Sequence, residues 1–149
     1  MFVSPLPKPF DRIAVHSWIV TNKASKEVNR WEVWQHRNKC STAWGYVHKN
    51  LLPIEAGMNR SPFTLHRDHR WESQMIGKVE GPLASKMIRF VNIWAPRYFF
   101  SQWYFIWPGP NSNTFIQWIL NTFPEANLSL PKTAKGKAFP ALLFTKLSV

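Results

Sequence analysis

Proline and glycine residues set where helices of this chain can begin and end. Gly81-Pro82 indicates a helix start, because proline fits the first helical turn, and Pro96 stops the same helix. Between these points apolar residues recur at three- and four-residue spacing, namely Leu83, Met87, Phe90, Val91 and Trp94. The spacing predicts an amphipathic helix with one face packed on a sheet.

A second helix is bounded in the same way. The turn Trp107-Pro-Gly-Pro110 breaks any regular structure, and Pro124 ends the helix that follows it. Four polar residues, Asn111-Ser-Asn-Thr114, can cap this helix ahead of an apolar face made by Phe115, Ile116, Ile119, Leu120 and Phe123.

The first half of the chain has the composition of β-strands. Residues 12–20 are rich in β-branched and aromatic side chains, and residues 29–36 make a plausible hairpin partner. Strict alternation predicts Trp31, Val33 and Gln35 on one face of that second strand and Glu32, Trp34 and His36 on the other. We expect further strands at residues 43–48, 62–66 and 98–107.

Length and composition favour one folded domain. The residues are 45% hydrophobic and 15% aromatic, which is enough to bury one core. A chain of 149 residues is too short for two such cores. We therefore expect a single α+β domain, residues 1–149, with helices packed on an antiparallel sheet. Three prolines within residues 5–9 predict an extended N-terminal arm over residues 1–10.

The net charge of +11 indicates attraction to anions such as a phospholipid surface, a nucleic acid or an acidic substrate. No long run of like charges occurs, which weakens the nucleic-acid hypothesis. Cys40 is the single cysteine, so no intramolecular disulfide forms. Without a recognisable signal peptide we expect a cytoplasmic protein, and residues 90–107 are too polar to span a bilayer.

The segment Pro108–Phe115 is the strongest candidate for chemistry. Backbone N–H groups at a helix start favour an anion, so Ser112 is a candidate nucleophile with Asn111 and Asn113 as oxyanion donors. Gly109 and Thr114 complete the candidate substrate-binding set. The alternative is simple capping, since Asn and Ser are preferred at helix starts, although four such residues exceed what a cap requires.

These motifs also support a resemblance. The chain resembles a family of bacterial proteins known only as a domain of unknown function, through residues 107–115 (Trp-Pro-Gly-Pro-Asn-Ser-Asn-Thr-Phe), residues 130–139, and the shorter strings His16-Ser-Trp18, Arg30-Trp-Glu-Val-Trp34 and Arg70-Trp71. The resemblance runs nearly end to end and brings no known reaction with it.

In its order of residues the chain also resembles circularly permuted papain-like proteins, the NlpC-type peptidases and lecithin-retinol acyltransferase-like enzymes. That resemblance implies His16 as general base, Glu32 or His36 as its polar partner on the next strand, and a nucleophile at Ser112, where those enzymes have cysteine. It implies a hydrolase or acyltransferase acting on an amide or ester, with a small-molecule, peptide or lipid substrate. The alternatives are a half-buried strand histidine for His16 and a solvated strand face for Glu32.

Other candidate sites carry weaker signals. The pairs His66/His69 and His36/Cys40 have metal-compatible spacing but lack a third ligand, so we expect neither a metal nor another cofactor. A basic and aromatic patch at residues 60–71 and the lysines of residues 132–137 could meet an anion. They support the alternative function, a non-catalytic binding module for anionic lipid or nucleic acid. Substrate and oligomeric state stay open.

Overall fold

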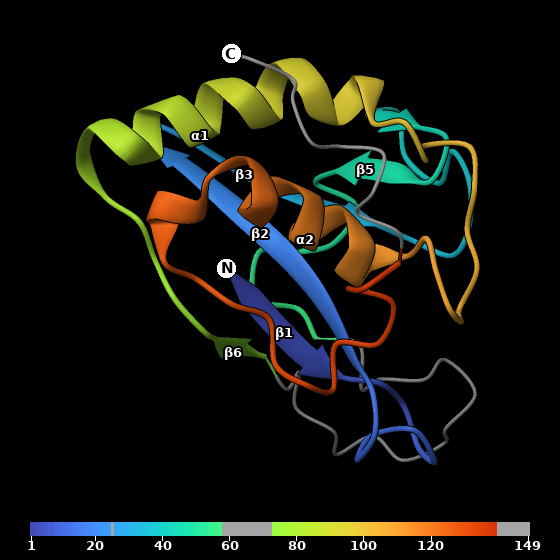
Figure 1. The fold of residues 1–149 in the computed structure, drawn as a ribbon. Coiled ribbons are helices and arrows are strands. Elements are labelled where there is room, and N and C mark those ends of the chain that lie inside the picture. The colour runs from blue at the N-terminus through green and yellow to red at the C-terminus, as the bar shows by residue number, and fades with distance from the viewer. Residues whose placement is uncertain (25, 58–72, 140–149) are drawn as a thin grey trace.

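The computed structural model describes residues 1–24, 26–57 and 73–139. Its sheet has the strand order β4-β5-β3-β2-β1-β6, and every pair of neighbours is antiparallel (Figure 1). The strands are β1 (Phe2–Pro5), β2 (Val15–Lys23), β3 (Glu27–Val33), β4 (Ala43–Trp44), β5 (Val47–Lys49) and β6 (Gln74–Met75).

The hairpin of β2 and β3 is the centre of the sheet. Its register pairs Ile19 with Trp31, so odd-numbered residues of both strands share one face and even-numbered residues share the other. Ile19, Trp31 and Val33 on the odd face belong to the hydrophobic core. The predicted alternation of β3 is therefore confirmed for Trp31 and Val33.

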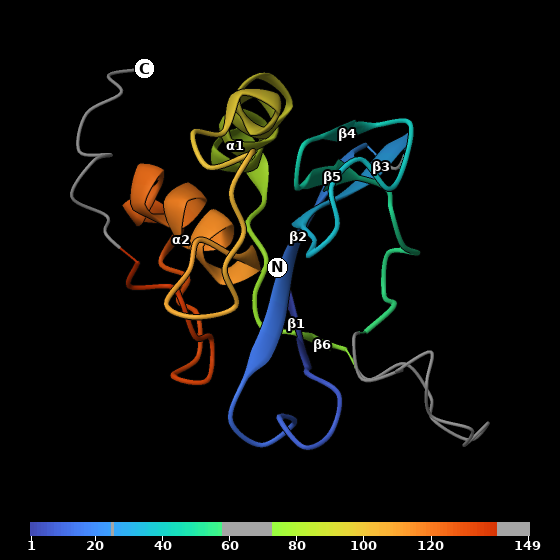
Figure 2. The ribbon, with the colours of Figure 1, turned by 90° about the vertical axis from the view of Figure 1, so that its right-hand side faces the viewer.

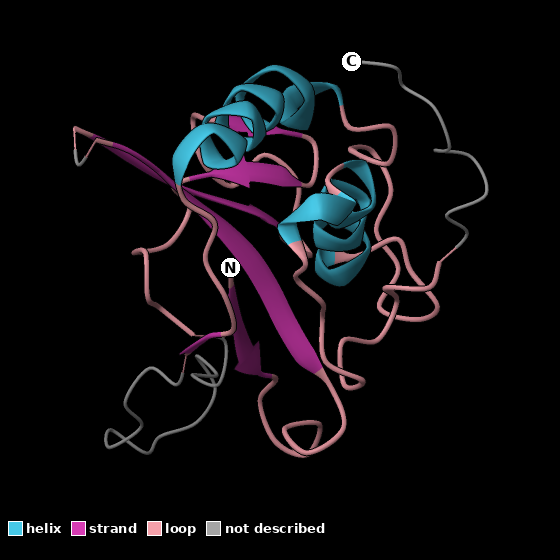
Figure 3. Cartoon of the chain, turned by 60° about the vertical axis from the view of Figure 1, so that its left-hand side comes forward, coloured by secondary structure: helices cyan, strands magenta, loops and turns pink. Residues whose placement is uncertain are grey.

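Both helices pack on the odd face of the sheet. They are α1 (Gly81–Trp94) and α2 (Ser112–Thr122), followed by the short 3₁₀ turns η1 (Ala95–Arg97) and η2 (Pro124–Ala126). The views in Figure 2 and Figure 3 show a layer of helices beside a layer of strands. No helix among the described ranges is long and apolar enough to cross a bilayer.

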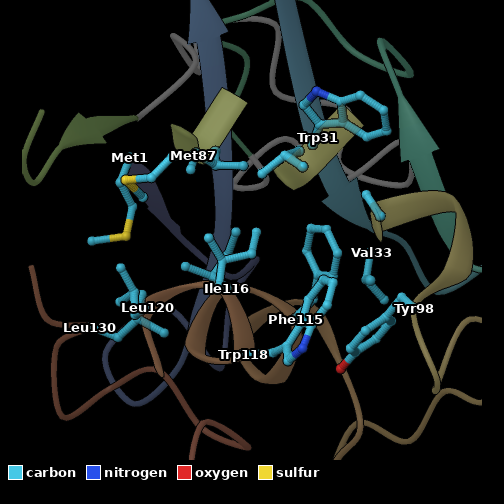
Figure 4. Packing of buried hydrophobic residues seen from close by; sticks show 14 of the residues in the cluster. Met1, Trp31, Val33, Met87, Tyr98, Phe115, Ile116, Trp118, Leu120 and Leu130 are labelled. Carbon is cyan, nitrogen blue, oxygen red and sulfur yellow. The ribbon is translucent and has the colours of Figure 1, made fainter. Parts of the chain in front are cut away.

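The core lies between these two layers. Phe115, Ile116 and Ile119 of α2 are fully buried, and they meet Met87 of α1 and Trp31 of β3 in one cluster (Figure 4). Five aromatic rings of this cluster lie within edge or tilted contact of one another: Phe90, Tyr98, Phe115, Trp118 and Phe123. Large rings thus supply much of the apolar contact that joins the helices to the sheet.

A loop, in place of helices, covers the opposite, even-numbered face of the sheet. The indole of Trp18 donates to the backbone oxygen of Ile54, and Arg30 donates to the backbone oxygens of Pro53 and Ala56. Residues 53–56 therefore lie over the centre of this face. Backbone carbonyls of this loop thus satisfy the indole N–H of Trp18 and Nη1 of Arg30, which allows these groups to be buried.

The structure confirms an α+β fold with an antiparallel sheet and places both predicted helices. The predicted arm at residues 1–10 contributes β1, and the predicted strand at residues 43–48 is split by Gly45 into β4 and β5. The strand expected at residues 98–107 is wrong, since this segment is a loop of turns. The strand expected at residues 62–66 lies outside the described residues.

Candidate functional site

Two of the predicted catalytic residues are in contact. The Nε2 atom of His16 lies 2.7 Å from Oε2 of Glu32, and both side chains are buried on the even face of the sheet. Alternation along β3 predicted that Glu32 and Trp31 lie on opposite faces of the strand. The solvent-exposed position considered for Glu32 is wrong, because its side chain is 0% exposed. His16 and Glu32 form a buried carboxylate–imidazole pair.

Arg30 completes this pair and was missed in the sequence. Its Nη2 donates to the same Oε2 of Glu32 at 2.8 Å, and its guanidinium carbon lies 4.1 Å from the ring centroid of Trp18. Residues two apart on a strand share a face, so the alternation along β3 could have predicted that Arg30 lies beside Glu32. We call Arg30, Glu32 and His16 the polar cluster.

The charges of the polar cluster support one another. Burial by itself would raise the pKa of Glu32, but the hydrogen bonds and charges of His16 and Arg30 outweigh burial and hold that pKa below its usual value. Burial lowers the pKa of Arg30, and Glu32 opposes this shift. Glu32 is therefore ionised at neutral pH, and its charge compensates that of Arg30.

The second nitrogen of His16 decides what the cluster can do. In the neutral imidazole whose Nε2–H donates a hydrogen bond to Glu32, Nδ1 carries a free lone pair, and it forms no hydrogen bond with another described residue. The imidazole lies between two indoles, with ring centroids 5.8 Å from Trp18 and 5.7 Å from Trp34. A carboxylate that orients an imidazole in this way is also the partner of histidine general bases in enzymes.

Ser112 does not join the cluster. Ser17 is next to His16 on β2, and its hydroxyl donates to Oδ1 of Asn113 on α2 at 2.8 Å. Since neighbouring residues of a strand point to opposite faces, His16 points away from the helix that begins at Ser112. The structure brings His16 to Glu32 and leaves Ser112 on the other side of the sheet.

The start of α2 is closed by its own residues. The side-chain oxygen of Asn111 accepts from the backbone N–H groups of Asn113 and Thr114, at 3.0 and 3.3 Å. The hydroxyl of Thr114 accepts in turn from the backbone N–H of Asn111 at 3.1 Å, which completes a capping box. The cap thus uses the N–H groups of Asn113 and Thr114, which were expected to be available to an oxyanion.

The amides of this motif also join α2 to distant segments. Asn113 Nδ2 donates to the backbone oxygens of Val15 at 2.9 Å and of Lys135 at 2.8 Å. Asn111 Nδ2 donates to Lys135 as well, and to the backbone oxygen of Ile106. Their side chains therefore hold β2, the preceding loop and residues 133–137 around the helix start.

Glycine is needed where the backbone packs against this motif. Gly109 has φ of +117°, and a Cβ atom there would lie 2.9 Å from the hydroxyl oxygen of Thr114. Gly136 has φ of +87°, and a Cβ atom there would lie 2.3 Å from Nδ2 of Asn111. Both positions combine left-handed backbone with close approach, which explains glycine there without a role in substrate binding.

Other predicted sites add little within the described residues. That part of the chain contains no group of three or more His, Cys, Asp or Glu side chains able to hold a metal ion. Cys40 contacts Thr42 and the backbone of Lys49 instead of His36. The pair His66/His69 and the basic and aromatic patch at residues 60–71 lie outside the described residues. Lys135 meets the helix start through its backbone oxygen.

The loop before α2 exposes several large apolar side chains. Trp103, Phe105, Ile106 and Trp107 are 58%, 51%, 70% and 69% exposed, and we call these four residues the aromatic loop. The aromatic composition that predicted a strand here instead belongs to a loop at the edge of the molecule (Figure 1). An exposed apolar group of this kind is a candidate interaction surface.

Glu32→Gln tests the polar cluster. The change leaves the charge of Arg30 buried without compensation, and we expect it to lower the free energy of unfolding by roughly 3–5 kcal/mol at pH 7. Because folding lowers the pKa of Glu32, its stabilisation is complete above about pH 4.5 and is lost as pH falls through the lower, folded pKa. The difference between variant and wild type should shrink in acid.

Urea unfolding at a series of pH values measures both effects. The matched control is Glu27→Gln, because Glu27 is 53% exposed and lies 3.7 Å from Lys49. It should cost no more than about 1 kcal/mol. Equal losses in the two variants would contradict a compensated buried charge at Glu32.

Asn111→Ala and Ser112→Ala test which residue caps the start of α2. The first change removes the acceptor of two backbone N–H groups and should cost about 0.5–2 kcal/mol of unfolding free energy. The second should change it by less than about 0.5 kcal/mol, since the hydroxyl of Ser112 bonds to no other described residue. A larger loss in Ser112→Ala, measured by urea unfolding, would count against this assignment.

The comparisons with known proteins place the chain in a family. Neither a curated protein nor a solved structure matches this chain. The sequence profile described as "Protein of unknown function (DUF3750)" matches residues 7–139, which is most of the chain. The expectation of a family of unknown function is confirmed: the chain belongs to the DUF3750 family.

Proposed function

We propose that this protein is a non-catalytic binding module for an extended anionic surface. Its exposed cations carry the proposal, because surface ion pairs within the described ranges neutralise only Lys49 and Lys78. Exposed lysines and arginines without an acidic partner there are Lys8, Arg12, Lys23, Lys26, Arg37, Lys39, Lys86, Arg89, Arg97, Lys132 and Lys135. Such a surface attracts a polyanion over several ångströms.

The closed start of α2 supports binding over catalysis. A nucleophilic Ser112 needs a base within hydrogen-bond reach, and His16 points to the other face of the sheet. Asn111, Asn113 and Thr114 serve the fold through their side-chain hydrogen bonds. The polar motif of residues 111–114 thus has a structural explanation that leaves the surface as the site of function.

Three cations lie close to the aromatic loop, and we call them the cationic border. Arg97 lies in η1, ahead of the loop in the chain, and donates to the backbone oxygen of Ile93, while Arg37 donates a hydrogen bond to Gln102. Lys135 is linked to Ile106 through the side chain of Asn111, which donates to both backbone oxygens. The segment from Gly81 to Pro124 contains no acidic residue, so nothing in it offsets these charges.

Retention on heparin tests the proposed function. We expect the apparent affinity of the wild-type protein to fall at least about tenfold between roughly 50 and 200 mM salt, because bound counterions are released on binding. Reversing the cationic border in Arg37→Glu/Arg97→Glu/Lys135→Glu should move elution to lower salt. A control with the same change in net charge, Lys8→Glu/Lys23→Glu/Lys26→Glu, should move it less. Elution independent of salt would contradict the proposal.

Hydrolysis of an amide or ester is a second candidate, favoured by the 2.7 Å contact of His16 and Glu32. Here Nδ1 of His16 takes a proton from water while the water oxygen bonds to the carbonyl carbon. The leaving group receives that proton as its bond to the carbon breaks. Glu32 orients the imidazole and stabilises its positive charge, and water replaces Ser112 as nucleophile because Ser112 lies across the sheet.

Turnover of a p-nitrophenyl ester tests this second candidate. The wild-type protein should hydrolyse it, and His16→Gln should reduce kcat/KM by roughly 10²–10⁴-fold. Ser112→Ala should retain the activity, and a serine-directed fluorophosphonate should leave the wild-type protein unlabelled. Labelling that disappears in Ser112→Ala would restore the serine as nucleophile, and no turnover by folded wild-type protein would remove the hydrolase candidate.

A further inference from the structure

We infer that the aromatic loop is an anchor for the interface of an anionic lipid bilayer, with the cationic border holding the lipid headgroups. This inference rests on the proposed function and names the partner. Four large apolar side chains within five consecutive residues, Trp103, Phe105, Ile106 and Trp107, are each more than half exposed. A domain that buries a dense aromatic core beside this loop leaves these side chains in water.

The loop is held in a fixed shape with these side chains outside. Between the exposed residues, Tyr104 turns inward, and its ring stacks on Tyr46 with centroids 5.6 Å apart. The backbone N–H of Phe105 donates to the oxygen of Pro110 at 2.9 Å, and that of Trp103 donates to Phe100 at 3.0 Å. Because the fold already orders the backbone, little conformational entropy is lost when the loop binds.

Residue types on the loop select a bilayer over a nucleic acid. Tryptophan is enriched at the membrane–water interface, where one edge of the ring is apolar and the other polar. Ile106 is the most exposed member at 70%, and an aliphatic side chain cannot stack on a base. Transfer of this side chain from water to the acyl chains lowers the free energy, as it does for apolar side chains of proteins that lie on a membrane surface.

The charges around the loop fit anionic headgroups. Arg37 reaches the loop through Gln102, and Lys135 is linked to it through Asn111. Arg97 precedes the loop in η1, where its guanidinium donates to the backbone oxygen of Ile93, and none of the three forms an ion pair within the described ranges. Long cationic side chains can extend to headgroup phosphates while neighbouring apolar groups enter the acyl boundary. Apolar insertion and charge attraction thus act at one site, as stable surface binding requires.

Vesicle sedimentation with the full chain tests the inference. The vesicles contain phosphatidylcholine with phosphatidylglycerol, and the variant is Trp103→Ser/Trp107→Ser. We expect its partition coefficient to fall about tenfold or more, because two apolar anchors are removed. The matched control, Phe10→Ser/Ile13→Ser, removes two apolar side chains that are 55% and 56% exposed in another loop, and should bind as wild type.

Quenching by lipids brominated in their acyl chains gives a second readout. Part of the wild-type tryptophan emission should be quenched on anionic vesicles, and that part should disappear in Trp103→Ser/Trp107→Ser. Both variants should keep wild-type retention on heparin, which separates the anchor from the charge.

Two failures are distinguishable. If wild type binds neither heparin nor anionic vesicles, the proposed function fails. If it binds heparin but not vesicles, or if the Trp103→Ser/Trp107→Ser variant binds vesicles as tightly as wild type, the lipid anchor is overturned and the loop serves another partner.

Discussion

The side chain of Asn113 is the contact on which the rest of this structure depends. It accepts from Ser17 and donates to the backbone of Val15 and Lys135, so one amide joins α2 to β2 and to a segment more than twenty positions later. Fixing Ser17 toward the helix sends His16 to the other face of the sheet. Asn113 thereby separates the helix start from the polar cluster, and the neighbouring Asn111 holds the end of the aromatic loop through the backbone oxygen of Ile106.

Much of the fold follows from local physical rules. Both helices could be predicted because Gly81-Pro82, Pro96 and Pro124 leave a helical segment few places to begin or end. Alternation also placed Trp31 and Val33 on the core side of β3. Residues 98–107 show the limit: aromatic residues favour strands only where a sheet gives them a surface to pack on, and no strand in the described part of the chain pairs with this segment.

Part of the candidate site could also be predicted from the sequence, and part could not. The pairing of His16 with Glu32 could be expected, because adjacent antiparallel strands bring their same-face residues together. Arg30 follows from the same spacing once Glu32 is known to be buried. The role of Ser112 could not be settled from sequence, since a polar residue at a helix start looks alike as a cap, a nucleophile or neither, and only the direction of its neighbours' hydrogen bonds separates these roles.

Hydrogen–deuterium exchange on vesicles tests the central claim, a binding module anchored by its aromatic loop, most directly. On adding phosphatidylglycerol vesicles, peptides that cover residues 99–110 should gain protection, while peptides from β2 and β3 keep the exchange they show in solution. Vesicles of phosphatidylcholine alone should produce a much smaller change. Protection confined to any other segment, or none at all, would contradict the account.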